Sequence, residues 1–389
     1  MVLLIAIAGL PACNEPPPVM KGPQPVAKEP WLIEKGKVLQ LTGDTDVQGR
    51  RDLPGETRST RMPDMVALSD RHWLVVYVEY ASPYKRGEWA RLVVTQTYDA
   101  GETWHTQVLS TARKPDRPRN AGGSMARIRR LRDGTLIIST SVGGTVHLFF
   151  SGDDGKTWSP PHDAGLATVM TKKFGRAPGL VQAHRILELP GGTLLMMPHE
   201  AAAGPFEGWT ITHVFASDDA GRTWSYRSTI KDDAYGLCEP AMWARGKRVQ
   251  IYCRDNHRPT WEHDMVVLRS EDEGRTWAIV RVVREIRGGH QATLTPLRDG
   301  RVMVIFRTLK GQGWSNGIGL WVHDSETLRG QVYPVVQAGG AWSNDSGAAA
   351  ELSDGTLLLV YATVYKTAET TWPEKRLQLL ILPPGALEK

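Results

Sequence analysis

The sequence has few phenylalanines, little net charge and no long apolar run. Its 6 Phe are outnumbered by 14 Trp, which is unusual for an ordinary hydrophobic core. No apolar segment approaches the roughly 18 residues that a membrane-spanning helix needs. The net charge is only +5 over 389 residues, and no run of Lys or Arg is interleaved with aromatic residues. We therefore expect no nucleic-acid partner.

A globular chain with many turns is compatible with this composition. With 41% hydrophobic and 23% charged residues, the chain is neither disordered nor collagen-like. The 39 Gly, about one residue in ten, favour many short strands over long helices. Arg127, Arg129 and Arg130 surround the apolar Ile128, a pattern that indicates the solvated face of a strand.

The first 35 residues are predicted to lie outside the fold. Residues 1–13 (MVLLIAIAGLPAC) resemble the end of a bacterial lipoprotein signal, in which Cys13 would carry the lipid. No basic residue precedes the apolar stretch, so an unprocessed tail is the alternative. Residues 14–35 contain a Pro-rich run typical of a tether. We expect an exported protein of the bacterial cell envelope, periplasm or extracellular space, which contacts a membrane only through Cys13.

Two further cysteines lie in a predicted hairpin. Cys238 and Cys253 stand symmetrically about the turn at residues 244–247, so in that register they face each other. Either a disulfide or two buried free thiols fits this arrangement. The same register places Glu239 opposite Tyr252 and diagonal to Arg254. An arginine there would keep Glu239 ionised, as a base or as half of a structural ion pair.

Internal repeats indicate the architecture. A Leu-x-Asp-Gly turn followed by an apolar strand begins at Leu131, Leu297 and Leu352, and weaker copies extend the series to six. Each unit contains about four strands, which is typical of propeller blades. We predict an all-β, six-bladed β-propeller over residues 36–389, which the strand within Trp31–Leu41 could close. A second motif, Ser/Thr-x-Asp-x-Gly-x-Thr-Trp, occurs four times: Thr97–Trp104, Ser151–Trp158, Ser217–Trp224 and Ser270–Trp277.

This second motif could be taken for a calcium loop, but it is better explained as a turn. Asp and Thr side chains can bond the turn backbone, Gly supplies a positive φ, and Trp can pack between blades. The sequence therefore predicts no metal and no cofactor.

Polar residues gather at one predicted face of the ring. In a propeller, the innermost strand of each blade begins near the axis, and the second strand ends at the same face. Strand ends at this face should carry apolar residues if they only filled a core. Instead several arginines and carboxylates occur there, which favours an anionic ligand over a water-filled channel. These positions include Arg61, Glu79, His184, His199, Glu200, Glu239, Arg254, His290, Arg307 and Asp345.

Over residues 36–389 the chain resembles the sialidase (neuraminidase) superfamily, which has six-bladed propellers with Asp-box repeats. The resemblance implies three arginines that hold the carboxylate of sialic acid, a Tyr nucleophile activated by a Glu, and an Asp acid/base. Arg61 in Arg61-Met62-Pro63 matches the first arginine, and Arg254 matches the second. Glu239 matches the activating Glu, and Arg307 is a third arginine. From their places at the mouth we also expect His290, Asp345 and Glu200 to contact the substrate.

Two departures from the family pattern concern the catalytic residues. The last blade begins Asn344-Asp345-Ser346-Gly347, without the family's Tyr, and residues 82–88 lack its Asp. Glu79 or Glu88 could replace the acid, and Tyr252 or Tyr365 could serve as nucleophile.

Three functions follow from these matches and departures. The first is a sialidase-type exo-glycosidase that acts as a monomer on terminal acidic sugars. The second is a lyase of uronate polysaccharides, suggested by the histidines beside arginines. The third is a glycan-binding propeller without activity.

Overall fold

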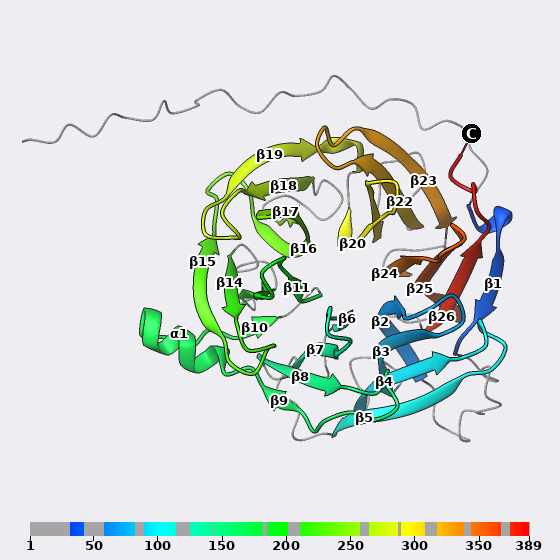
Figure 1. Cartoon of the computed structure of the whole chain (residues 1–389), viewed down its shortest axis with the longest axis horizontal. Coiled ribbons are helices and arrows are strands. Elements are labelled where there is room, and N and C mark those ends of the chain that lie inside the picture. The colour runs from blue at the N-terminus through cyan, green and yellow to red at the C-terminus, as the bar shows by residue number, and fades with distance from the viewer. Residues whose placement is uncertain are drawn as a thin grey trace, which may run out of the picture.

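The computed structural model confirms a six-bladed β-propeller, whose sheets surround a central axis (Figure 1). Among the described strands, five sheets have four strands and one has six. All of their strand pairs are antiparallel. No helix in the described part of the chain is long and apolar enough to cross a membrane. The structure describes residues 32–42, 58–81, 89–113, 125–142, 144–181, 185–200, 211–256, 264–286, 289–307, 317–337, 344–366 and 374–388.

The blades follow one another along the chain. Blade 1 contains β2 (Arg58–Ala67), β3 (Trp73–Ala81), β4 (Trp89–Thr97) and β5 (His105–Arg113). Blade 2 contains β6 (Ala126–Arg130), β7 (Leu136–Val142), β8 (Thr145–Ser151) and β9 (His162–Asp163). Blade 3 contains β10 (Leu180–Val181), β11 (Leu187–Glu188), β12 (Leu194–Met196), β13 (His199–Glu200), β14 (Thr212–Ser217) and β15 (Ser225–Ile230).

The second half of the ring is more regular. Blade 4 contains β16 (Leu237–Arg245), β17 (Arg248–Asp255), β18 (Met265–Ser270) and β19 (Ala278–Val283). Blade 5 contains β20 (His290–Pro296), β21 (Arg301–Arg307), β22 (Gly317–Asp324) and β23 (Gly330–Gln337). Blade 6 contains β24 (Asn344–Glu351), β25 (Leu357–Lys366), β26 (Glu374–Leu382) and β1 (Lys37–Gln40).

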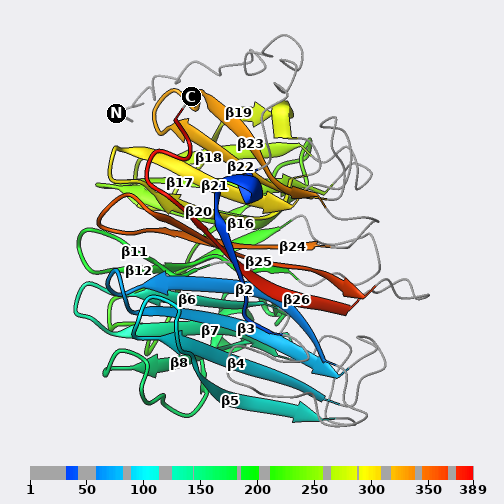
Figure 2. The same ribbon diagram turned by 90° about the vertical axis from the view of Figure 1, so that its right-hand side faces the viewer.

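The N-terminal strand closes the ring, as the sequence predicts. β1 pairs with β26 as the outermost strand of blade 6, so the two ends of the chain share one sheet. β26 also lies beside β2 at the seam between the last and first blades (Figure 2). The short 3-10 helix η1 (Leu32–Lys35) precedes β1, and Leu32 is buried. The folded part therefore includes the last four residues of the predicted tether, because Leu32 joins the core between blades 5 and 6.

The four repeated turns use their own polar side chains to hold the backbone. In Ser151–Trp158, Asp153 accepts hydrogen bonds from Ser151 Oγ (2.8 Å), Thr157 N (2.9 Å) and Thr157 Oγ1 (2.6 Å). Gly155 has φ +84°, and a Cβ there would lie 2.4 Å from Leu74 of the preceding blade. The other three segments repeat the same Asp–Thr bonds. The carboxylates thus stabilise the turns.

The hydrophobic core consists of six apolar layers, one at each seam between neighbouring blades. Each repeated-turn tryptophan packs on the blade before its own. Trp104 belongs to the layer between blades 6 and 1, and Trp224 to the layer between blades 2 and 3. Trp158 and Trp277 pack at the layers between blades 1 and 2 and between blades 3 and 4. The excess of tryptophan therefore reflects the architecture in part.

Besides η1, two further short helices lie in connections between blades. α1 (Leu166–Phe174) links blades 2 and 3 and lies outside the ring (Figure 1). Leu166 and Met170 are its buried residues, and the helix ends at Gly175, whose φ is +70°. The 3-10 helix η2 (Arg284–Ile286) links blades 4 and 5.

Candidate functional site

The innermost strands of several blades are bulged at the point where they approach the axis. The β2–β3 register shifts after Arg61, the β16–β17 register after Cys238, and the β20–β21 register after His290. The residue that follows each shift has a positive φ: +52° at Met62, +49° at Glu239 and +53° at Gln291. Such values are uncommon for residues other than glycine, and bulges redirect side chains.

A fourth bulge lies in β24, where the register shifts between Asp345 and Ala348. A Cβ at Gly347 would lie 1.8 Å from the carbonyl oxygen of Val360, so only glycine fits. The Gly347 carbonyl accepts a hydrogen bond from Thr293 Oγ1 on β20 (2.5 Å), which joins blades 5 and 6 at the axis.

Six charged side chains from four blades meet above these bulges, and we call them the axial cluster: Arg61, Glu239, Arg254, Arg307, Asp345 and Lys375. Asp345 is its centre. Its carboxylate receives Arg61 Nε (2.9 Å) and Arg61 Nη2 (3.0 Å), and it pairs with Arg307 Nη1 (3.3 Å) and Lys375 Nζ (3.0 Å). Four cations thus surround two carboxylates, leaving a formal excess of two positive charges when all are ionised.

Asp345 and Arg61 of the axial cluster differ in their exposure to solvent. Asp345 is 0% exposed, whereas Arg61 retains 9% of its surface. Solvent therefore reaches part of the Arg61 side chain and not the carboxylate that holds it. Burial would raise the pKa of Asp345, but Arg61, Lys375 and Arg307 hold it well below its usual range. Asp345 remains ionised at any physiological pH.

Glu239 occupies the other half of the axial cluster. Its Oε2 lies 3.4 Å from Arg254 Nη1 and accepts a hydrogen bond from the Gln291 backbone N–H (3.2 Å). Burial would raise the pKa of Glu239, but Arg254, His199 and Arg307 lower it below its usual value. Burial lowers the pKa of His199 to about 4, so this histidine is neutral near pH 7. Glu239 is therefore an ionised carboxylate and a candidate base.

A second ion pair stabilises the axis beside the cluster. Arg185 donates Nε (2.9 Å) and Nη2 (2.5 Å) to Asp64 on β2, and its Nη1 donates to the Leu294 carbonyl on β20 (3.4 Å). Arg127 donates to the Pro63 carbonyl (3.1 Å) and is 1% exposed. The solvated position predicted for Arg127 is wrong, because β6 is an innermost strand and this side chain lies in the crowded centre. Arg130 alone of the predicted set is exposed.

The structure brings five of the predicted site residues together and separates others. Arg61, Glu239, Arg254, Arg307 and Asp345 all belong to the axial cluster. Glu200 instead binds Arg176 Nη2 (2.6 Å) and His213 Nε2 (2.9 Å), toward the outside of blade 3. Glu79 is buried on β3, on the strand side that carries Val75 and Tyr77 and packs against blade 6.

The register predicted for the β16–β17 hairpin is wrong. The turn is centred on Gly246 and Lys247, so Ala241 faces Tyr252, and the bulge at Glu239 then moves the pairing back by one residue, so Cys238 faces Arg254. Cys238 and Cys253 are therefore buried free thiols. The hydroxyl of Tyr252 binds Gln250 Oε1 (3.2 Å) and His323 Nε2 (3.1 Å), away from Glu239. Burial raises the pKa of Tyr252 well above its usual value, so this residue is a poor nucleophile.

Several predictions fall outside the described residues: Cys13, Glu88 and His184, together with the side chains of His290 and Tyr365. The backbone of Tyr365 lies at a bulge of β25, between Val364, which pairs with Lys375, and Lys366, which pairs with Glu374. Among tyrosine side chains that the structure describes, none contacts Glu239. In the same described residues, no group of three or more His, Cys, Asp or Glu side chains is placed to hold a metal ion.

Sequence reasoning missed Lys375, Asp64 and Arg185. It considered only the two innermost strands of each blade, whereas Lys375 lies on the third strand of blade 6. Asp64 directly follows Arg61-Met62-Pro63, so its position in the sequence could have drawn attention to it. Its ion pair with Arg185 could not be predicted from spacing, because the two residues are 121 positions apart.

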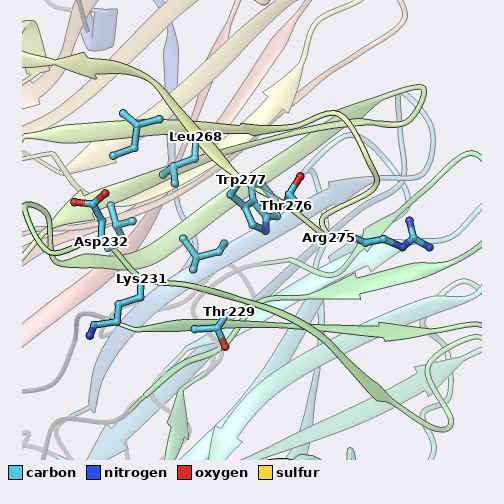
Figure 3. A pocket seen from close by; sticks show the side chains of 10 residues that line it. Thr229, Lys231, Asp232, Leu268, Arg275, Thr276 and Trp277 are labelled. Atoms are coloured by element: carbon cyan, nitrogen blue, oxygen red, sulfur yellow. The ribbon is translucent and has the colours of Figure 1, made fainter. Parts of the chain in front are cut away.

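A separate pocket lies at the outer seam between blades 3 and 4 (Figure 3). Lys231, Asp232, Arg275 and Trp277 are among the residues that line it, and no member of the axial cluster does. This pocket and the axial cluster are therefore different features of the molecule.

Comparison with known proteins agrees with this architecture. The family described as BNR repeat-like domain matches residues 136–282. A search of curated proteins finds no match. A crystal structure of a protein of unknown function from Dyadobacter fermentans aligns with a TM-score of 0.67 at 15% identity, covering 90% of this chain and 98% of that chain.

Two sialidases have the same fold. The NanB sialidase of Streptococcus pneumoniae aligns with a TM-score of 0.63 at 13% identity, covering 90% of this chain and 71% of that one. The Trypanosoma rangeli sialidase in complex with sialic acid aligns with a TM-score of 0.57 at 16% identity, covering 91% of this chain and 58% of that one. This protein is thus a six-bladed propeller that contains a BNR repeat-like region at residues 136–282 and has a fold similar to that of these sialidases.

Proposed function

We propose that this protein is a sialidase-type glycosidase that binds a terminal acidic sugar at the axial cluster. The observation that carries the proposal is the meeting of Arg61, Arg254 and Arg307, from three different blades, with the ionised Glu239. Guanidinium groups recognise carboxylates through paired, charge-assisted hydrogen bonds. The excess positive charge of the axial cluster favours an anionic ligand over a neutral one.

In this proposal Asp345 and Glu239 have different tasks. Asp345 fixes the Arg61 guanidinium in place through two hydrogen bonds, so little side-chain freedom is lost when a sugar carboxylate binds. Glu239 accepts a proton from the nucleophile that attacks the anomeric carbon. Tyr365 is the candidate nucleophile, because it follows Val364, the β25 partner of Lys375, and Lys375 contacts Asp345.

The test is the release of fluorophore from a 4-methylumbelliferyl sialoside. We expect turnover by the wild type, a loss of at least a hundredfold in Glu239→Gln, and a comparable loss in Tyr365→Phe. Glu102→Gln is the matched control, because Glu102 is exposed in the repeated turn Thr97–Trp104 at the ring's edge. Equal turnover by Glu239→Gln and the wild type would refute the proposed base.

A second candidate function is glycan binding without cleavage. It is favoured by one observation: no tyrosine hydroxyl of the described residues contacts Glu239. This function predicts that the protein retains an acidic glycan on an array while the fluorogenic sialoside stays intact. Arg61→Ala would then abolish retention, whereas Glu102→Ala would not.

We also propose that the chain is exported and attached to a membrane through a lipid at Cys13. The support is the apolar run of residues 1–10 that precedes Leu-Pro-Ala-Cys. Expression in a bacterium with labelled palmitate tests this proposal. The wild type should incorporate the label and Cys13→Ser should not; absence of label from the wild type would contradict the anchor.

A further inference from the structure

Lys375 shares a carboxylate with two arginines. Its Nζ lies 3.0 Å from Asp345 Oδ2, and its side chain is only 3% exposed. Arg61 already binds both oxygens of Asp345, and Arg307 contacts one of them. The amine is therefore the third cation on a carboxylate that one guanidinium would satisfy. The Lys375 carbonyl also accepts a hydrogen bond from Thr60 Oγ1 (2.9 Å), which joins β26 to β2.

The position of Lys375 is hard to explain by stability. An amine loses its hydration when buried, and the neighbouring guanidiniums repel it. Burial lowers the pKa of Lys375 to about 7. The nearby Asp345 carboxylate acts against this decrease, whereas Arg61 and Arg307 add to it. An apolar side chain of similar length would leave Asp345 paired with both arginines and would avoid the buried charge. Residues that reduce stability at such a centre commonly serve function.

We propose that Lys375 is a fourth cationic binding residue of the axial cluster, whose protonated amine is neutralised by the anionic group of the bound sugar. This inference rests on the proposed function and adds a residue to it. Among the residues that the structure describes, charged groups from three strands act on the amine: Asp345 on β24, Arg61 on β2 and Arg307 on β21. Arg376 follows it on β26, and Glu79 on β3 lies on the side that packs against blade 6.

Proton uptake then accompanies anion binding. Below pH 7 the amine already carries its proton, so pH has little effect on affinity. Above pH 7 the free protein loses that proton and the bound form retains it. The dissociation constant should therefore rise by up to about tenfold per pH unit above this point. A residue that only filled space would produce no such dependence.

Isothermal titration calorimetry with free N-acetylneuraminate tests the inference without requiring turnover. The wild type should bind at least tenfold more weakly near pH 8.5 than near pH 6. Lys375→Met should bind weakly at both values. Lys375→Arg, which keeps its charge at both, should bind well with little pH dependence. Lys156→Met is the control for net charge, because Lys156 is exposed on a distant turn; it should match the wild type.

Thermal unfolding gives a second measurement. Lys375→Met should unfold at a higher temperature than the wild type near pH 6, because the buried charge is gone. A lower unfolding temperature would contradict our account of the cost of burying the amine, and a pH-independent wild type that binds tightly would overturn the inference. If Lys375→Met fails to fold, Lys375→Arg and the wild-type pH profile still decide. If the wild type and Lys375→Met bind N-acetylneuraminate with equal affinity, only the role of Lys375 is refuted. If the wild type does not bind it, the proposed function is refuted as well.

Discussion

The Asp345 carboxylate accepts two hydrogen bonds from the Arg61 guanidinium, across the seam where the last blade meets the first. The two residues are 284 positions apart, so this pair forms only when the ring has closed. It connects the architecture to the chemistry, because the seam that completes the propeller also holds the arginine that is most exposed in the axial cluster.

Asp345→Asn should therefore be strongly destabilising. The variant leaves Arg61, Arg307 and Lys375 around a neutral amide, and removing one partner of a buried ion pair typically costs about 3–5 kcal/mol. Chemical denaturation should show this decrease in the free energy of unfolding. Asp299→Asn is the control, since Asp299 pairs with Arg301 at half-exposed positions and should cost less than about 1 kcal/mol. Similar losses in both variants would contradict our account of the axial cluster.

The repeated turns should respond to acid. Asp219 accepts bonds from Ser217 and Thr223, and the Thr223 side-chain bond is the main cause that lowers its pKa to about 2. A depressed carboxyl pKa contributes stability above the unfolded value of 3.8, and this is lost as the pH falls through about 2. Asp219→Asn should thus melt below the wild type at pH 7.

The difference in melting temperature between Asp219→Asn and the wild type should shrink as the pH approaches 2. Asp233→Asn, at a fully solvated loop position, should match the wild type throughout. A difference for Asp219→Asn that stays constant down to pH 2 would argue against ionised turn carboxylates.

The two core cysteines should be chemically silent in the folded protein. Cys238 and Cys253 are fully buried, and burial raises the pKa of Cys238 to about 12. Thiolates are the reactive form, so Ellman's reagent should not label them in the native state. In guanidinium chloride the reagent should label two thiols per chain in the Cys13→Ser variant, in which Cys238 and Cys253 are the remaining cysteines. A yield of none would indicate a disulfide.

The closing strand should contribute to global stability. Leu41 follows β1, is 3% exposed, and packs in the layer between blades 6 and 1. Leu41→Ala should lower the free energy of unfolding by about 2–5 kcal/mol. Val108→Ala, at a position 42% exposed on β5, should change it by less than about 0.5 kcal/mol. Equal effects would mean that the ring does not depend on its N-terminal strand.

Local patterns predicted the architecture because they act within a few residues. The Leu-x-Asp-Gly turns form as expected, with Thr135 N donating to Asp133 and Thr356 N donating to Asp354. The box turns at Asp153 and Asp219 likewise depend on bonds that span four residues or fewer. Counting from these turns also located Arg61, Glu239 and Arg254 near the axis.

The sequence by itself determined that there are six repeated units, how each turns, which strand closes the ring, and that Arg61, Arg254 and Arg307 lie at inner strand ends. Only the tertiary structure decided how these side chains pair. Four bulges shift the register of the inner strands by one position, and the bulge at Glu239 places Cys238 opposite Arg254. The position of the β16–β17 turn pairs Tyr252 with Ala241 and so separates it from Glu239. Packing of blade 5 against blade 6 brings Arg307 to Asp345, the fold of blade 6 itself brings Lys375 there, and ring closure adds Arg61. These contacts join residues far apart in the chain, and their energies depend on burial, which no local pattern specifies.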